Sequence, residues 1–258
     1  MASWSTKRRL SYALIFTIVI ILTVVVPIFK FFYKAPTCFD NKKNGDETDV
    51  DCGGSCRKLC QSAFLPPRIE WGGAKFEKLA NGLYNASSYI VNPNINGGAI
   101  NVPYKISLYD AEGVLITERI GTVNLYPHRN SLAFQTAINV NKSIPVKATF
   151  EFTNAPQWFR AEDKLTGVSV IDKKYEENEN SSSLQVTIEN NTLYSFDNIQ
   201  VSAVLYDSSG NVIGFSQTKL DSIPKGGREI APFTWSDSRS NRVVTQEILL
   251  NIIPISNR

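Results

Sequence analysis

The feature that most constrains this chain of 258 residues is an uncharged run near its amino terminus, from Leu10 to Phe29. About 20 apolar residues in a helix, rising 1.5 Å each, span the ~30 Å hydrocarbon core of a bilayer. A core helix of a soluble protein is rarely uncharged over several turns. We therefore predict a transmembrane helix over residues 10–33, with residues 1–9 in the cytoplasm.

The residues that flank this run favour an uncleaved signal anchor. A cleaved signal peptide has a shorter apolar region, of about 7–15 residues, with small residues at the cleavage site. Lys7, Arg8 and Arg9 precede the run, but Lys30 and Lys34 follow it, so a count of lysines leaves the orientation open. The tight amino-terminal cluster and the cysteines beyond the run favour a cytoplasmic amino terminus and extracytoplasmic carboxyl-terminal domains at the cell membrane.

All four cysteines lie in one short segment after the predicted span. An even number of cysteines outside a membrane predicts two disulfides, and three pairings of them are possible. Zinc is the alternative, but structural zinc sites use short C-x2–4-C pairs, whereas the spacing here is C-x13-C-x3-C-x3-C. We predict a disulfide-rich stalk module over residues 36–61, cross-linked by Cys38, Cys52, Cys56 and Cys60.

The same segment contains an acidic loop, which suggests calcium binding. Calcium prefers hard oxygen ligands, and Gly45 allows a sharp turn between them. The order of the residues does not match an EF-hand, and a solvated acidic turn is the alternative. The candidate ligands are Asp40, Asn44, Asp46, Asp49 and Asp51. No other cofactor is expected.

From Asn44 to Cys56 the chain reads NGDETDVDCGGSC. This string resembles a short cysteine-rich module of bacterial surface and secreted proteins, usually written NG-x-ETDVDCGG-x-C. The resemblance covers a small part of the chain. It implies an extracytoplasmic setting and assigns no activity.

The rest of the chain contains an internal repeat. Leu108-Tyr109-Asp110-x-x-Gly113 recurs as Leu205-Tyr206-Asp207-x-x-Gly210, at an offset of 205 − 108 = 97. Each unit has the size of a domain, so we predict a tandem duplication over residues 64–160 and 161–258 rather than a solenoid. The same offset pairs Asn94 with Asn191, Asn101 with Asn198, Pro127 with Pro224, Val146 with Val243 and Asn154 with Asn251.

Each unit is predicted to be a β-sandwich. Runs rich in Val, Ile, Thr and Phe are separated by Gly, Pro, Asn and Asp at short spacing, and no helical stripe follows the apolar run. One strand alternates with a single buried face that comprises Leu132, Phe134, Thr136, Ile138 and Val140. The predicted fold class is mostly β: one amino-terminal transmembrane α-helix, then two tandem Ig-like antiparallel β-sandwiches of about seven strands each.

The repeated Asp-x-x-Gly motif has a structural explanation. Aspartate at the first position and glycine at the fourth suit a type I turn in which the glycine takes a positive φ. We therefore predict structural turns, rather than catalytic or metal sites, at Asp110, Gly113, Asp207 and Gly210. The charged segment from Lys173 to Ser183 is predicted to be an exposed loop or hairpin tip.

The second unit resembles the FxLYD family. The resemblance rests on Leu205-Tyr206-Asp207 and on the later Pro224-Lys225-Gly226-Gly227; the first unit keeps Leu108-Tyr109-Asp110 but has Pro127-His128-Arg129-Asn130 in place of that turn. Members of this family are Ig-like sandwiches, often found outside bacterial and archaeal membranes. The resemblance implies the fold and carries over no site residues.

Little in the chain points to catalysis. His128 is the single histidine, and there is no Gly-x-Ser-x-Gly elbow, phosphate loop or dinucleotide fingerprint. The net charge is only +3 and the basic residues are scattered, so no nucleic-acid partner is expected. Trp71, Trp158 and Trp235 are typical core anchors of sandwiches.

These observations predict a membrane-anchored protein that is not an enzyme. It would act as an interaction or structural module of the cell envelope, in contact with the lipid bilayer and with an envelope protein or a cell-wall glycan. Its oligomeric state stays open. The alternatives are a calcium-dependent structural surface module and an envelope hydrolase built around His128.

Overall fold

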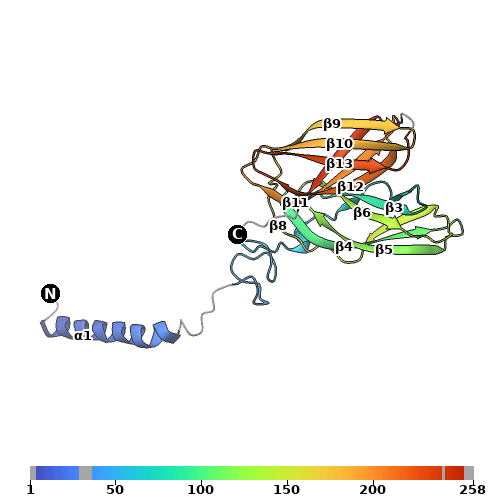
Figure 1. Ribbon diagram of the computed structural model, residues 1–258. Coiled ribbons are helices and arrows are strands. Elements are labelled where there is room, and N and C mark those ends of the chain that lie inside the picture. Colours follow the sequence, from blue (N-terminus) through green and yellow to red (C-terminus); the bar gives the residue numbers. More distant parts are fainter. Residues whose placement is uncertain (1–3, 29–36, 240–241, 253–258) are drawn as a thin grey trace.

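The computed structural model describes residues 4–28, 37–239 and 242–252. In this part of the chain an apolar helix lies at the amino terminus, an irregular segment follows it, and antiparallel β-sheets form most of the rest (Figure 1). The other helical segment is a 3-10 turn over Gln61–Ala63. The predicted fold class, a single amino-terminal helix before antiparallel β-sandwiches, is confirmed.

The helix begins earlier than predicted. Helix α1 spans Trp4–Ile20, a π-turn follows over Ile21–Val25, and the apolar helical stretch Arg8–Ile28 is long enough to cross a membrane. No glycine or proline separates Trp4 from Leu10, so nothing stops the helix in the predicted tail. Residues 29–33 of the predicted span lie outside the described residues.

The first sandwich consists of two four-stranded sheets. In one, β3 pairs with β1, β2 and β6; in the other, β4 lies between β5 and β7 and also pairs with β8. Its core lies between these sheets. The strands are β1 (Arg68–Ile69), β2 (Lys75–Lys78), β3 (Tyr84–Val91), β4 (Gly97–Tyr109), β5 (Leu115–Leu125), β6 (Asn130–Ile138), β7 (Lys147–Phe152) and β8 (Phe159–Arg160).

The second sandwich has two three-stranded sheets, ordered β13-β10-β9 and β12-β11-β14. Within the described residues it therefore has six strands, not the seven or so predicted. Its core is lined by both sheets. The strands are β9 (Val168–Asn178), β10 (Ser181–Asn190), β11 (Phe196–Tyr206), β12 (Val212–Ile223), β13 (Arg228–Trp235) and β14 (Thr245–Asn251).

The duplication extends to the three-dimensional structure. Adding 97 to the bounds of β5 gives 212–222, and β12 spans Val212–Ile223. In both units the strand that carries the Leu-Tyr-Asp motif, β4 or β11, lies between the next strand and the last long strand. Asn101 and Asn198 both adopt a left-handed conformation, with φ of 52° and 55°.

The charged segment from Lys173 to Ser183 forms a hairpin and its tip, which is one of the two predicted alternatives. It contains the end of β9 and the start of β10, and only Glu179 and Asn180 connect them. Most side chains of β9 are exposed, because this strand lies at the edge of its sheet. Charged side chains are a common protection for such an edge, and this explains why the composition suggested a loop.

The two sandwiches pack face to face, so that four sheets lie in a stack (Figure 1). We call the contact between them the seam. Strand β6 shows why the seam was not predicted. Leu132 and Phe134 face the seam, whereas Ile138 and Val140 belong to the core of the first sandwich. Between them Ala137 has a φ of 53°, which switches the exposed face of the strand. The single buried face predicted for this strand was therefore wrong, and Thr136 is exposed.

Candidate functional site

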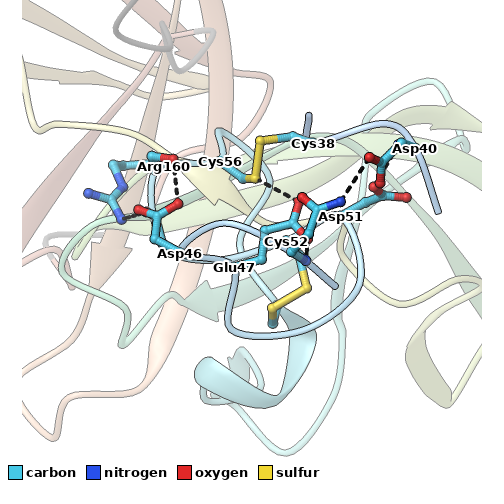
Figure 2. Close-up of a disulfide and its surroundings, with 12 residues drawn as sticks. Cys38, Asp40, Asp46, Glu47, Asp51, Cys52, Cys56 and Arg160 are labelled. Atoms are coloured by element: carbon cyan, nitrogen blue, oxygen red, sulfur yellow. Dashed lines mark hydrogen bonds between the residues drawn. A yellow bond between two sulfur atoms is a disulfide. The ribbon is translucent and has the colours of Figure 1, made fainter. Parts of the chain in front are cut away.

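Two disulfides organise the segment after the helix (Figure 2). Cys38 pairs with Cys56, and Cys52 pairs with Cys60. The sequence left three pairings open, and the structure selects this one. All four sulfur atoms are used in these bonds, so none is a thiolate ligand for zinc.

The cysteine module is packed onto the first sandwich. The amide of Leu59 donates to the carbonyl oxygen of Trp158 at 3.3 Å, and the amide of Arg160 donates to that of Arg57 at 2.9 Å. Leu59 is buried in the core of the first sandwich, and the Phe64 ring stacks on Trp158 with centroids 5.4 Å apart. The module is therefore braced against the sandwich along its carboxyl-terminal half.

The tryptophans occupy two kinds of position. Trp158 and Trp235 are buried in the cores of the first and second sandwich, which confirms them as core anchors. Trp71 is half-buried and packs instead at the seam, against Tyr89 and Phe215. It therefore joins the two units rather than supporting one of them.

The acidic residues of the module serve local hydrogen bonds. Asp51 accepts from the amides of Asp40 and Asn41, both at 2.9 Å, and so closes the turn between them. Asp46 accepts from the Ser55 hydroxyl at 2.7 Å, and this bond lowers the pKa of its carboxyl group.

Asp40 accepts from the side-chain amide of Asn44 at 2.9 Å, a bond that likewise lowers the pKa of Asp40. Asp49 accepts from the amide of Val50. Asp40, Asp49 and Asp51 thus accept backbone amide hydrogens, whereas Asp46 and Asn44 bond side chains. Among the described residues, the Oδ1 atom of Asn44 is buried without a hydrogen-bond partner.

The predicted calcium ligands do not form a cluster of carboxylates in the described part of the chain. The acidic and sulfur groups that converge are Cys38, Glu47 and Cys56, with ligand atoms within 4.8 Å of one another. Two of these three atoms are the sulfurs of a disulfide, which leaves a single carboxylate. Calcium binding by Asp40, Asn44, Asp46, Asp49 and Asp51 stays a prediction.

Replacing Asp51 by asparagine tests whether this carboxylate orders the module. The variant keeps a side chain that tolerates the observed φ of 51° but loses the charge that accepts two amide hydrogens. We expect a loss of roughly 1 kcal/mol in the free energy of opening, seen as faster hydrogen exchange at the amides of Asp40 and Asn41. Asp49→Asn is the control; equal exchange in both variants would contradict this role.

The two Asp-x-x-Gly motifs form equivalent turns. Asp110 accepts from the amides of Glu112 and Val114, and Asp207 accepts from those of Ser209 and Asn211. Gly113 and Gly210 have φ of 79° and 77°, a conformation that glycine adopts without steric cost. Asn211 also bonds the carboxylate of Asp207 and lowers its pKa. Both aspartates are thus engaged in the turns where they lie.

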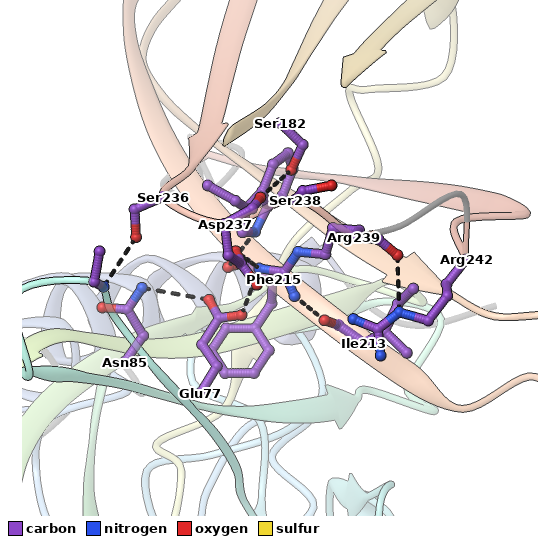
Figure 3. A network of polar contacts seen from close by, with 12 residues as sticks. Glu77, Asn85, Ser182, Ile213, Phe215, Ser236, Asp237, Ser238, Arg239 and Arg242 are labelled. Atoms are coloured by element: carbon purple, nitrogen blue, oxygen red, sulfur yellow. Dashed lines mark hydrogen bonds and ion pairs between the residues drawn. The ribbon is translucent and has the colours of Figure 1, made fainter. Parts of the chain in front are cut away.

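A buried ion pair crosses the seam (Figure 3). Arg239 of the second sandwich reaches Glu77 of the first at 3.0 Å and also contacts Asp237 at 3.1 Å. It donates a further bond to the carbonyl oxygen of Ile213. Burial raises the pKa of Glu77, while Arg239 acts in the opposite direction. The guanidinium lies close to the backbone of Gly214, where an added Cβ atom would be 2.8 Å from it.

A second polar contact crosses the seam at Glu247. Its carboxylate accepts from the hydroxyl of Tyr89 in the first sandwich at 2.6 Å and from that of Tyr206 in the second at 2.8 Å. Burial and the neighbouring carboxylate raise the pKa of both tyrosines. With the apolar cluster around Phe215, these bonds hold the two sandwiches as one unit.

A polar groove opens along the seam, and the sequence analysis did not find it. Its volume is about 510 Å³, within the ~300–1,000 Å³ typical of small-molecule sites. The lining side chains come from both sandwiches, and their positions are far apart in sequence. The sequence identifies Asn198 and Asn251 only as partners in the duplication. The groove is lined by Asn124, Asn198, Gln200, Gln217, Thr218, Lys219, Asn251 and Ile252.

His128 lies at the tip of a turn. Its side chain is exposed, its φ is 51°, and its amide donates to the carbonyl oxygen of Asn94 at 2.8 Å. Among the described residues no serine or aspartate hydrogen bonds to its ring. This arrangement gives no support to a hydrolase built around His128.

No family model and no curated protein matches this chain. Solved structures similar to it include red sea bream transglutaminase (7% identity over 73% of this chain and 31% of that chain, TM-score 0.25). Others are a β-glucuronidase from glycoside hydrolase family 2 (8% identity, 86% and 29%, TM-score 0.25) and a Bacteroides uniformis β-glucuronidase (10% identity, 71% and 26%, TM-score 0.22). The chain spans less than a third of each, and similarity at this level says nothing about what it binds.

Proposed function

We propose that this chain is a single-pass membrane protein that presents a non-enzymatic interaction module on the extracytoplasmic side of the cell membrane. The apolar helix is its uncleaved anchor, and the cysteine module leads into the double sandwich. The partner is a component of the envelope, either a protein or a glycan. The observation that carries the proposal is an apolar helix without protein cover, followed by a disulfide-linked module.

The helix has the properties of a lipid-embedded segment. The described side chains of Arg8–Ile28 are all exposed, so protein packing does not account for their apolar character. The hydroxyl groups of Thr17 and Thr23 donate to the carbonyl oxygens of Ala13 and Val19, at 2.9 and 2.7 Å. Their polar groups are thereby satisfied within the helix, as a bilayer requires.

The double sandwich is suited to presenting a fixed surface. Contacts across the seam link residues that are distant in sequence, such as Glu77 and Arg239, which are 162 positions apart. A unit held in this way has one arrangement of its surface. Binding to such a preorganised surface avoids the entropy cost of ordering flexible domains.

The anchor can be tested by charging the centre of the helix. Two arginines at the bilayer centre cost about 5–7 kcal/mol on insertion scales, so Ile18→Arg with Val19→Arg should release the chain from carbonate-washed membranes. The unaltered chain should stay with the membrane at its full mass of 28.8 kDa, with a carboxyl-terminal reporter outside the cytosol.

Ile28→Arg is the matched control, because it places the charge at the end of the span, where it should be tolerated. A mature protein that lacks the helix would show a cleaved signal peptide. A reporter in the cytosol would reverse the orientation. Either result would overturn the proposal.

A further inference from the structure

We propose that the polar groove along the seam binds a hydroxyl-rich oligosaccharide segment, and that Lys219 favours sugars that carry a carboxylate. This inference rests on the proposed function, because it names the ligand class of the extracytoplasmic module. Both sandwiches contribute to this groove: Asn124 comes from the first, and the remaining lining residues come from β11, β12 and β14 and the residue after it.

The floor of the groove is fixed by hydrogen bonds. Asn251 is only 4% exposed, and its side-chain amide donates to the carbonyl oxygen of Asn124 at 3.0 Å. On the wall formed by β11 and β12, Gln217 donates to the hydroxyl of Ser202 at 2.9 Å, and Gln200 donates to Gln217 at 2.8 Å. These bonds orient the amide groups before any ligand arrives, which lowers the entropy cost of binding.

Several polar groups of the groove are left without protein partners. In the described part of the chain, the side chains of Asn198, Thr218 and Lys219 make no hydrogen bond or ion pair, and the Oε1 atom of Gln200 accepts none. Asn198 and Lys219 are exposed, whereas Gln200 and Thr218 are half-buried. The wall thus presents amide donors and acceptors, a hydroxyl and one ammonium to whatever enters.

The duplication shows that the fold does not need these residues. Each groove position on β11 and β12 has an equivalent in the first sandwich, 97 residues earlier, and the two strands concerned occupy equivalent places. Asn198 keeps its equivalent, Asn101, and the shared left-handed conformation. At the positions of Gln200, Gln217, Thr218 and Lys219 the first sandwich instead has Pro103, Ile120, Gly121 and Thr122.

The pattern of groups matches vicinal hydroxyls. A sugar hydroxyl both donates and accepts, as a carboxamide side chain does, so a row of amides can be satisfied on every side by a saccharide. A single lysine among neutral groups does not provide the multiple phosphate contacts that nucleic acid needs. The volume of about 510 Å³ suits a short oligosaccharide segment rather than a folded domain.

The test uses the full chain in a detergent without a sugar headgroup, titrated with tetragalacturonate, chitotetraose and maltotetraose in separate calorimetric experiments. We expect saturable binding of at least one probe, with tetragalacturonate binding most tightly at low salt. Gln200→Leu and Lys219→Ala should each weaken binding about tenfold, the effect of losing one good hydrogen bond or charge contact. Lys225→Ala, at an exposed lysine outside the groove, is the matched control.

Binding that weakens about tenfold in each of the two groove variants and is unchanged in Lys225→Ala supports the inference. It is overturned if no probe binds, or if the groove variants bind like the unaltered chain. Neither of those results bears on the proposed membrane anchor, because the carbonate and reporter experiments test the anchor separately. Thermal unfolding of each variant shows that loss of binding does not come from loss of fold.

Discussion

Replacing Arg239 by alanine is expected to lower the free energy of unfolding by about 3–5 kcal/mol. The side chain is 6% exposed and its partner Glu77 is 13% exposed, so the variant leaves a carboxylate buried without its counter-charge. Removing one partner of a buried pair costs more than the pair contributes, because the remaining charge cannot be solvated. Chemical unfolding of the full chain in detergent, followed by tryptophan fluorescence, measures the change.

The loss of unfolding free energy in Arg239→Ala should depend on pH. Burial already raises the pKa of Glu77 in the folded protein, and the loss of Arg239 removes the group that opposes this effect. An acid whose folded pKa lies above its unfolded value destabilises the fold once the pH rises through the folded pKa. The difference between Arg239→Ala and the unaltered chain should therefore be largest near neutral pH and should shrink as the pH falls and Glu77 takes up a proton.

Arg228 provides the matched control for Arg239. It lies in the same sandwich and pairs with Glu189 at 2.6 Å, but its side chain is 65% exposed. Exposed pairs contribute about 0–1 kcal/mol, so Arg228→Ala should change stability little and without the same pH dependence. If the two variants lose equal stability, the ion pair across the seam does not have the role assigned to it.

The sequence predicts the fold well because the information that specifies it is local or periodic. The uncharged run identifies the helix, and a gapless offset of 97 identifies the two units with equivalent strands. The turns at Asp110 and Asp207 follow from the conformational preferences of a few neighbouring residues. Each of these inferences needs only the segment in which it is made.

The seam and its groove depend instead on contacts between distant segments. Leu132 and Phe134 show an alternation that signals a buried face, but the sequence does not say whether that face meets its own sandwich or the other. The cysteine pairing is similar, since three pairings satisfy the same spacing. The acidic loop leaves calcium binding a prediction for a different reason: carboxylates that accept backbone amide hydrogens have the same composition as metal ligands.

Replacing Phe215 by alanine is expected to separate the unfolding of the two sandwiches. Phe215 is 2% exposed, and its ring lies 6.1 Å from that of Phe134 and 6.4 Å from that of Trp71, both in the first sandwich. Removing a buried phenylalanine side chain costs about 3–5 kcal/mol, and here much of that cost falls on the contact between the units. Calorimetry of the full chain in detergent should show one cooperative transition for the unaltered protein and two for this variant.

Phe233→Ala distinguishes a loosened seam from a general loss of stability. Phe233 is also 2% exposed, but it lies in the core of the second sandwich, where its ring faces Trp235 at 6.4 Å. A cavity there should cost a similar free energy while leaving the seam contacts in place, since the packing around Trp71 is unchanged. We therefore expect hydrogen exchange on β3 and β6, in the first sandwich, to rise in Phe215→Ala and not in Phe233→Ala. The same exchange pattern in both variants would mean that the sandwiches are not coupled through this cluster.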